Sequence, residues 1–185
     1  MSDDADRTYS LDDLLHQPTR WDDLIAADLS AEIERLLAEK INTIPEMRRF
    51  LAIKGYRELR RYLEAAIQGR SGEDALRAMV FAMRTFARDR PGLSAATFKN
   101  LAAESPEWRR EGEALTRLVL GVFADLGVTG RTAGHALRAL RALVRGFVIH
   151  EMTCASLQPS DHDDAWHFAV DLYMRGLIAL RTTPG

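Results

Sequence analysis

Hydrophobic residues recur at helical spacing along most of the chain, and no strand-length run alternates apolar with polar residues. The clearest case is residues 134–151, whose apolar positions surround Gly146, His150 and Glu151. A small residue and two titratable ones on an apolar helix suggest close packing, or a cavity with a polar lining. A core helix with one exposed end is the alternative. The pattern predicts an all-α protein.

Start and stop residues divide the chain into eight expected helices. Ser71, Ser105 and Ser160 stand where N-caps are expected, and Pro91-Gly92 should break the chain between two helices. Connections are short, and no internal repeat is present. The expected helices cover residues 10–16, 21–40, 45–68, 71–88, 94–103, 105–127, 130–154 and 160–180.

Composition narrows the class of protein. The chain has 185 residues, of which 46% are hydrophobic, and a formal net charge of −2, which suits one substantial domain or a small domain on a larger one. No window approaches the ~20 apolar residues of a membrane span, and the acidic N-terminus does not read as a signal peptide. The single cysteine, Cys154, excludes an internal disulfide. We therefore expect a soluble protein of the reducing cytoplasm.

The negative charge is concentrated at the front of the chain. Residues 1–40 contain eleven Asp and Glu residues but only four Lys and Arg residues. An acidic segment repels phosphate, so this part of the sequence is a poor nucleic-acid binder as written.

Enzyme and metal motifs are weak or absent. The sequence has no P-loop, dinucleotide glycine fingerprint, G-x-S-x-G or H-E-x-x-H. His150 with Cys154, and Asp163 with His167, are four residues apart, but neither pair has a clear third ligand nearby in the sequence. We predict no enzymatic activity, no metal site and no cofactor.

Arginines form a stripe on the helix expected at residues 130–154. Arg138, Arg141 and Arg145 follow an i, i+3, i+7 spacing, which places them on one helix face. Such a stripe could attract an acidic ligand or partner, and a solvated face is the alternative.

Four segments, in order, resemble the ligand-binding body of TetR-type transcriptional regulators. The similarity is greatest to the subgroup with a W/H-G-like signature in the C-terminal domain. The second segment contains R-x-F-A-x-x-x-P-G-L. The segments are residues 41–59 (INTIPEMRRFLAIKGYREL), 73–93 (EDALRAMVFAMRTFARDRPGL), 135–151 (HALRALRALVRGFVIHE) and 163–180 (DDAWHFAVDLYMRGLIAL).

The resemblance implies an all-α homodimer with an N-terminal helix-turn-helix and a C-terminal body that holds a small-molecule cavity. Large apolar and aromatic lining residues would suit a hydrophobic or aromatic effector, and an ordinary solid core is the alternative. Carried onto this sequence, the lining residues would be Met83, Phe86, Phe98, Trp108, Leu118, Val122, Phe147 and His150.

The resemblance also implies that the last two long helices pair with their copies in a dimeric four-helix bundle. The small residues Gly146 and Gly176 suit close helix contact, and burial of both helices within one chain is the alternative. The expected interface residues are Leu140, Gly146, Trp166, Leu172, Tyr173, Gly176 and Leu177.

The front of the chain departs from the family pattern. A TetR-type regulator begins with three short helices and a glycine-containing turn, whereas residues 21–40 contain no glycine and read as one amphipathic helix. Glu32 and Glu34 stand where the recognition helix is expected, although DNA contact requires basic or neutral polar side chains. We therefore interpret residues 1–44 as a segment that replaces or diverges from a helix-turn-helix. Residues 45–185 are interpreted as the ligand-binding and dimerisation domain.

Two functions follow from these features. The first is a ligand-responsive transcriptional regulator of the repressor type whose DNA-binding module is degenerate or altered. The alternative is a homodimeric small-molecule-binding or protein-interaction module that does not bind DNA. A divergent helix-turn-helix that the pattern does not reveal would favour the first function.

Overall fold

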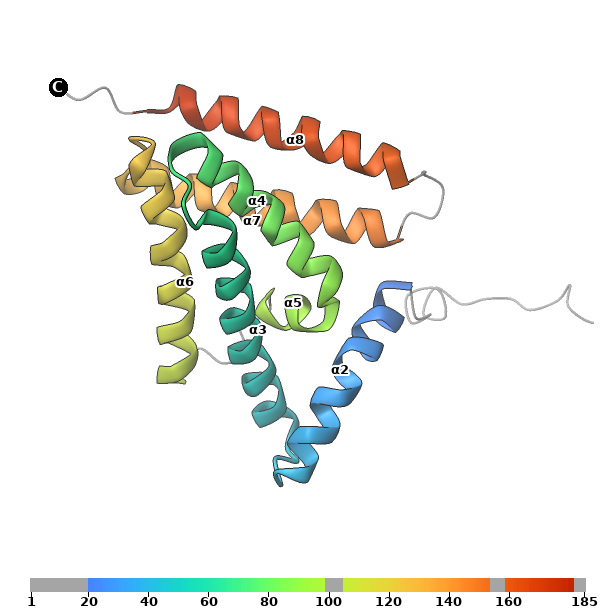
Figure 1. The fold of residues 1–185 in the computed structure, drawn as a ribbon. Coiled ribbons are helices and arrows are strands. Elements are labelled where there is room, and N and C mark those ends of the chain that lie inside the picture. The colour runs from blue at the N-terminus through green and yellow to red at the C-terminus, as the bar shows by residue number, and fades with distance from the viewer. Residues whose placement is uncertain (1–19, 99–104, 154–158, 182–185) are drawn as a thin grey trace, which may run out of the picture.

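The described part of the protein is built from helices joined by short connections (Figure 1). The computed structural model describes residues 20–98, 105–153 and 159–181. The helices are α2 (Arg20–Ala38), α3 (Ile44–Ile67), α4 (Gly72–Asp89), α5 (Pro91–Phe98), α6 (Pro106–Asp125), α7 (Gly130–Thr153) and α8 (Pro159–Ala179). The all-α class is confirmed, and the helix expected at residues 10–16 lies outside the described residues.

Most helices begin and end within one or two residues of their expected positions. In α6, Ser105 is the N-cap, and its hydroxyl oxygen accepts the backbone N–H of Trp108 at 3.4 Å. Ser71 is the N-cap of α4, but its side chain makes no capping hydrogen bond. Ser160 was expected to cap α8, but the helix begins two residues earlier than that cap allows, at Pro159. Proline is favoured in the first turn, where its missing N–H costs nothing.

The start of α5 differs from the prediction for a reason that is not local. This helix begins at Pro91, three residues before the expected start at Ser94. A carboxylate oxygen of Asp28 in α2 accepts the backbone N–H groups of Gly92 and Leu93, at 3.0 and 3.1 Å. These amides would otherwise lack partners in the first turn, so α2 supplies the cap that the local sequence lacks. The expected end of this helix at Ala103 lies outside the described residues.

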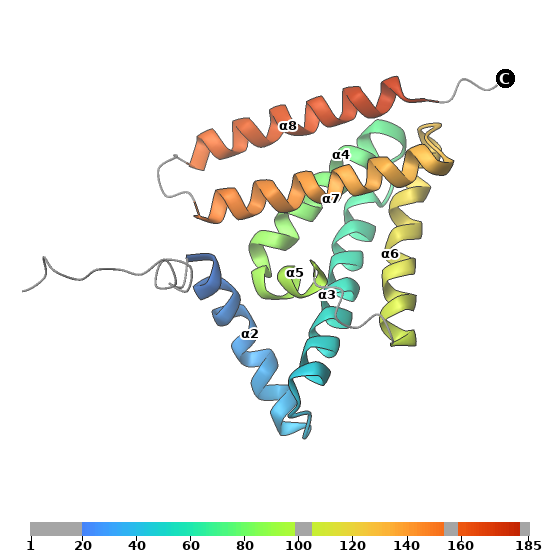
Figure 2. The ribbon, with the colours of Figure 1, turned by 180° about the vertical axis from the view of Figure 1, so that it is seen from behind.

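The central helix is α3, which packs against α4, α5 and α6. Figures 1 and 2 show α7 and α8 side by side and antiparallel along one end of the molecule. At the opposite end the chain turns sharply between α2 and α3, and the two helices diverge from that corner. Helix α5 lies between them and contacts both.

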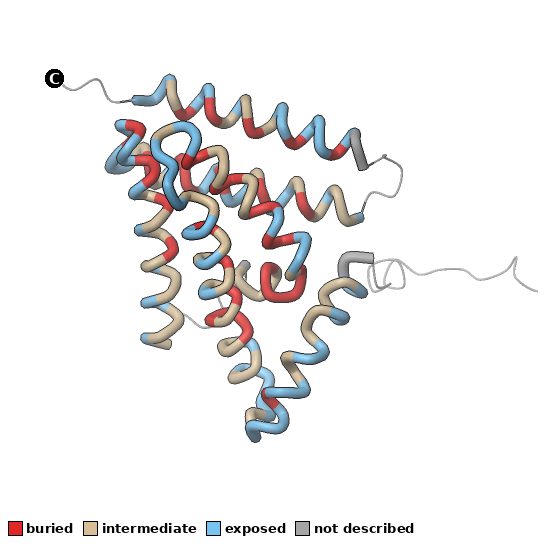
Figure 3. The backbone as a smooth tube through the Cα atoms, in the orientation of Figure 1, coloured by how far each residue is buried: buried red, intermediate tan, exposed pale blue. Residues whose placement is uncertain are grey.

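A single hydrophobic core joins all these helices. Figure 3 shows that the buried positions form stripes on the inner sides of the helices, as their periodicity predicts. Removing such apolar surface from water supplies the main favourable free energy of folding. The largest fully buried side chains include Trp166, Phe86, Phe123, Leu36, Leu63 and Leu140.

Two glycines allow α5 to approach its neighbours closely. A Cβ atom at Gly92 would lie 2.8 Å from Leu29 Cδ2 and 2.9 Å from the carbonyl oxygen of Ile25, both in α2. On the other side, a Cβ atom at Gly55 of α3 would lie 2.6 Å from the carbonyl oxygen of Leu93. Neither position has room for a larger residue. The absence of side chains at these two glycines lets the backbone of α5 pack directly against α2 and α3.

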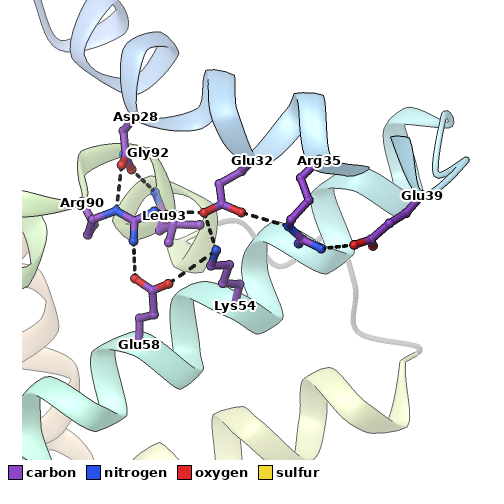
Figure 4. A network of polar contacts seen from close by, with 9 residues as sticks. All are labelled: Asp28, Glu32, Arg35, Glu39, Lys54, Glu58, Arg90, Gly92 and Leu93. Carbon is purple, nitrogen blue, oxygen red and sulfur yellow. Dashed lines mark hydrogen bonds and ion pairs between the residues drawn. The ribbon is translucent and has the colours of Figure 1, made fainter. Parts of the chain in front are cut away.

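Ion pairs reinforce this three-helix junction (Figure 4). Arg90, just before α5, donates to Asp28 of α2 at 2.8 Å and to Glu58 of α3. Lys54 of α3 binds Glu32 of α2. Burial raises the pKa of the Glu32 carboxyl, but the hydrogen bond from Lys54 and the nearby positive charges outweigh burial and lower it. Carboxylates of α2 that look isolated in the sequence therefore hold this helix to the rest of the chain.

Residues 20–38 form one continuous helix, as the pattern predicted. Because α2 contacts α3, α5 and α7, these residues pack with the following helices. The domain boundary expected at residue 44 stays a prediction. Within the described part of the chain, no helix is long and apolar enough to cross a membrane.

The close approach at Gly92 leads to a stability prediction. Replacing Gly92 with Ala should lower the free energy of unfolding by about 1–3 kcal/mol, because the new methyl group overlaps Leu29 and Ile25. The matched control is Gly121→Ala in α6, where nothing lies within 4 Å of the added Cβ. That change should stabilise the protein by up to about 1 kcal/mol. Urea denaturation followed by circular dichroism measures both, and equal effects would contradict the close contact.

Candidate ligand-binding cavity

A cavity of about 490 Å³ lies among α3, α4, α5, α6 and α7. Its size falls within the range of small-molecule sites in proteins, about 300–1,000 Å³. The lining residues are Tyr56, Leu59, Leu63, Met83, Phe86, Ala87, Ser94, Thr97, Trp108, Leu115, Val119, Leu137, Arg141, Ala142, Val144 and Arg145.

Most of the cavity wall is apolar and buried. Each of four long helices contributes residues three, four or seven positions apart, so each turns one face of its core stripe towards the cavity. Such a wall favours apolar ligand groups, because both surfaces leave water on binding. The buried apolar lining residues are Leu59, Leu63, Met83, Phe86, Ala87, Leu115, Val119, Leu137 and Val144.

Polar groups come from α3 and α5 on one side. The Tyr56 hydroxyl donates to the carbonyl oxygen of Thr97 at 3.2 Å, and the Thr97 hydroxyl donates to the carbonyl oxygen of Ser94 at 2.7 Å. Burial raises the pKa of Tyr56, and the positive charge of Arg141 opposes this rise. Tyr56 therefore stays a neutral hydroxyl at physiological pH, within the electrostatic reach of Arg141.

Trp108 of α6 and Arg141 of α7 add hydrogen-bond donors. The rings of Trp108 and Tyr56 lie 5.8 Å apart. The Trp108 Nε1–H is buried and has no hydrogen-bond partner in the described structure. An Nη atom of Arg141 donates to the Thr116 hydroxyl at 3.1 Å. The cavity thus combines an apolar wall with donors and positive charge, and its described lining contains no carboxylate.

Three of the eight residues expected to bind a ligand line this cavity: Met83, Phe86 and Trp108. The side chain of Phe98 lies outside the described residues. Leu118, Val122, Phe147 and His150 do not belong to the described lining. The binding role of the whole set stays a prediction.

The placement of Phe147 and His150 has a geometric reason. Phe147 packs against Trp166 of α8 with ring centroids 4.9 Å apart, and the His150 ring lies 6.3 Å from that of His162. Both therefore face α8. The cavity meets another face of α7, which carries Leu137, Arg141 and Val144.

The sequence did contain a signal for the polar side of the cavity. All three members of the arginine stripe are exposed; Arg141 and Arg145 line the cavity, and Arg138 does not. Other lining residues missing from the expectation come from α3, which supplied none of the expected residues, and from α5, which supplied only Phe98. They include Tyr56, Leu59, Leu63, Ser94 and Thr97.

A buried arginine fixes the helices around the cavity. Arg84 of α4 is only 6% exposed and binds both carboxylate oxygens of Glu151 in α7, at 2.9 and 2.7 Å. A third guanidinium nitrogen lies 2.7 Å from Asp163 of α8. The hydrogen bond from Arg84 lowers the pKa of the Asp163 carboxyl. Arg84 also lies 5.6 Å from the ring centroids of both Phe147 and Trp166.

The residues expected at a dimer interface differ in how far they are exposed on one chain. Leu172 is 57% exposed, and Gly146 and Gly176 have open space around them. Tyr173 is partly buried, and its hydroxyl donates to the carbonyl oxygen of Ala136 at 3.0 Å. Three residues lie inside the core of one chain and present no free surface to a second copy: Leu140, Trp166 and Leu177.

Metal-binding pairs gain no support from the geometry. No group of three or more His, Cys, Asp or Glu side chains that could hold a metal ion occurs in the described ranges. Cys154 lies outside them. Asp163 is engaged by Arg84, and His167 packs against Phe81 with ring centroids 4.8 Å apart.

Comparisons with known proteins place the chain among regulators. A family model described as "Tetracyclin repressor-like, C-terminal domain" matches residues 76–173. An uncharacterized HTH-type transcriptional regulator of Mycobacterium tuberculosis, Rv0681, is 27% identical over 137 residues, which cover 72% of this chain and 63% of that protein. The uncharacterized HTH-type transcriptional regulator YobS of Bacillus subtilis is 25% identical over 143 residues, or 77% and 74% of the two chains. The match thus spans less than two thirds of the mycobacterial relative.

The Arg84 contacts predict a large difference between two arginines of α4. Replacing Arg84 with Met should lower the free energy of unfolding by about 3–5 kcal/mol, because Glu151 would lose both short hydrogen bonds and keep only the more distant Arg88, 3.5 Å away. Arg77→Met removes an exposed ion pair with Asp171 and should cost at most about 1 kcal/mol. Guanidinium chloride denaturation measures both. Similar small losses would show that the buried contacts do not fix α4 against α7.

Proposed function

The chain belongs to the TetR-type regulator family, and on that premise we propose that it is a ligand-responsive transcriptional regulator of the repressor type. The observation that carries the proposal is the cavity, whose apolar wall includes Met83, Phe86 and Val119 within the region matched by the family model. A hollow of this size leaves the apolar side chains along its wall without close neighbours on one side. A ligand that fills it recovers those contacts.

The proposed effector is a hydrophobic or aromatic small molecule. Supporting this class, nine buried apolar residues make up most of the described lining. Binding of such a molecule gains mainly from the apolar surface removed from water, while the few polar groups orient it.

We further propose that the protein works as a homodimer formed through α7 and α8. Support comes from large apolar side chains that are exposed: Phe168 at 67% and Leu172 at 57% on α8, and Leu180 at 56% just after its end. Phe168 and Leu172 are one helical turn apart, and Gly176 follows one turn later, so they share a face. An apolar face of this kind, lacking a covering element in the described chain, suits a symmetric helix–helix contact.

DNA binding is the less supported part of the proposal. Residues 20–38 form one helix, and two of its acidic residues, Asp28 and Glu32, bind α3 and the start of α5. Because Asp28 and Glu32 are used within the chain, their charges do not indicate whether α2 binds DNA or a protein. Glu34 is exposed on the same helix and still opposes contact with phosphate. This continuity and exposed charge favour the second candidate function, a dimeric ligand-binding or protein-interaction module without DNA binding.

A combined DNA and ligand experiment separates the two functions. For the regulator, gel shifts at low salt with genomic fragments from the source organism should give specific complexes that an effector releases. Val119→Phe, which fills the cavity, should keep DNA binding but lose release. Leu118→Phe is the control, because Leu118 is next to Val119 in the sequence but its side chain does not line the cavity. A dimer that binds a neutral apolar dye such as Nile red, but shifts no fragment specifically, would favour the second function.

The proposed dimer predicts a change in molecular mass. Replacing Leu172 with Glu should convert the dimer to a monomer, because two carboxylates would be buried against an apolar face. Ile44→Glu is the control, since Ile44 is 63% exposed at the opposite end of the molecule. That variant should stay dimeric. Light scattering after size-exclusion chromatography gives the masses, and an unchanged mass for Leu172→Glu would exclude this interface.

A further inference from the structure

The charged side chains in the described lining of the cavity are all positive. Two arginines, Arg141 and Arg145, belong to its lining, and no Asp or Glu does in the described ranges. Both arginines are exposed, so solvent screens their charges, and they favour an anionic ligand group mainly through hydrogen bonds from the guanidinium donors.

Arg141 is placed to meet such an anion. Its hydrogen bond goes to the neutral Thr116 hydroxyl, and it forms no ion pair within 4.0 Å in the described chain. A guanidinium group offers five donors, so the contact with Thr116 leaves most of them for a ligand. A carboxylate matches two adjacent donors at once.

Trp108 provides an independent sign of a polar ligand group. Its Nε1–H is buried without a partner in the described structure, and an indole can only donate. A buried donor without an acceptor is destabilising, and native proteins contain few of them. Because Trp108 lines the cavity beside Tyr56, an acceptor atom of a ligand would satisfy it.

The remainder of the cavity is suited to a hydrocarbon group. Leu59, Leu63 and Leu115 line it from α3 and α6, opposite Met83 and Phe86 of α4, and all five side chains are buried. Hydroxyl-rich or multiply charged ligands would leave polar groups unsatisfied against this wall. One acidic group and an apolar body therefore match the two parts of the lining.

We propose that the ligand is an amphipathic carboxylic acid. Its carboxylate lies beside Arg141 and the Trp108 indole N–H, and its aliphatic or aromatic body lies among Leu59, Leu63, Met83 and Phe86. This inference rests on the proposed function, in which the cavity binds the effector. It adds that the effector carries an acidic group, and it states how the effector is oriented in the cavity.

Matched probes test the acid directly. Decanoate and decanol carry the same hydrocarbon body and differ in charge, so their affinities for the full chain isolate the head group. Isothermal titration calorimetry, at concentrations below those at which the probes aggregate, should show decanoate binding about tenfold more tightly than decanol.

Two variants localise the effect. Arg141→Gln should reduce the preference for decanoate to less than about threefold. Arg138→Gln should leave it unchanged, because Arg138 belongs to the same arginine stripe but not to the lining. Trp108→Phe keeps an aromatic ring, removes the donor and should weaken decanoate binding. Thermal unfolding of each variant checks that the fold is retained.

Different failures have different meanings. Equal binding of decanoate and decanol, or a preference that survives Arg141→Gln, would overturn the acidic ligand. The acidic ligand would also be overturned if decanoate did not bind while Nile red still bound and Val119→Phe excluded it. That result would leave the proposed function intact. If Nile red binding is also absent, or is unaffected by Val119→Phe, both the acidic ligand and the cavity's proposed function fail.

Discussion

The buried guanidinium of Arg84 is the constraint on which the arrangement of the other helices most depends. A charge in the core is tolerated only when its partners are close and well oriented. Glu151 of α7 and Asp163 of α8 meet that requirement from two helices at once, so α4, α7 and α8 share one relative position. Met83 and Phe86, the neighbours of Arg84 along α4, line the cavity opposite Val144 of α7. The Arg84 contacts therefore fix the relative positions of two helices that line the cavity, α4 and α7.

A second constraint lies at the other end of the ten-residue segment that begins with Arg84. The motif R-x-F-A-x-x-x-P-G-L runs from Arg84 to Leu93, and each of its fixed positions has a separate contact. Phe86 and Ala87 line the cavity, Pro91 begins α5, and Gly92 allows α2 to approach. The N–H of Leu93 binds Asp28. The motif is short, but its residues take part in the contacts of α4 with α7 and α8 and of α5 with α2.

Sequence periodicity determined the helices well, because burial of one stripe per helix needs only local spacing. Periodicity could not show which other helix, or which cavity, each apolar stripe packs against. Phe147 and His150 share helix α7 with Arg141, yet they face α8 while Arg141 faces the cavity. The contact of Arg84 with Glu151 joins residues 67 positions apart, and a stripe analysis treats both as surface groups. The early start of α5 likewise depends on a carboxylate from α2, which no local rule for capping includes. Long-range pairing thus accounts for most of what was missed.

Helix α5 connects the cavity to α2. Its residues Ser94 and Thr97 line the cavity, while its first amides bind Asp28 of α2 and its glycine touches the backbone of that helix. A ligand that contacts Ser94 or Thr97 therefore contacts an element whose other surface positions α2. Proximity alone does not transmit a signal, since a ligand shifts an equilibrium only by its difference in affinity for the two arrangements. The tight packing at Gly92 makes such a difference attainable, because α5 has no room to move against α2 without breaking the two hydrogen bonds to Asp28. These hydrogen bonds are therefore one direct link between α2 and an element that lines the cavity.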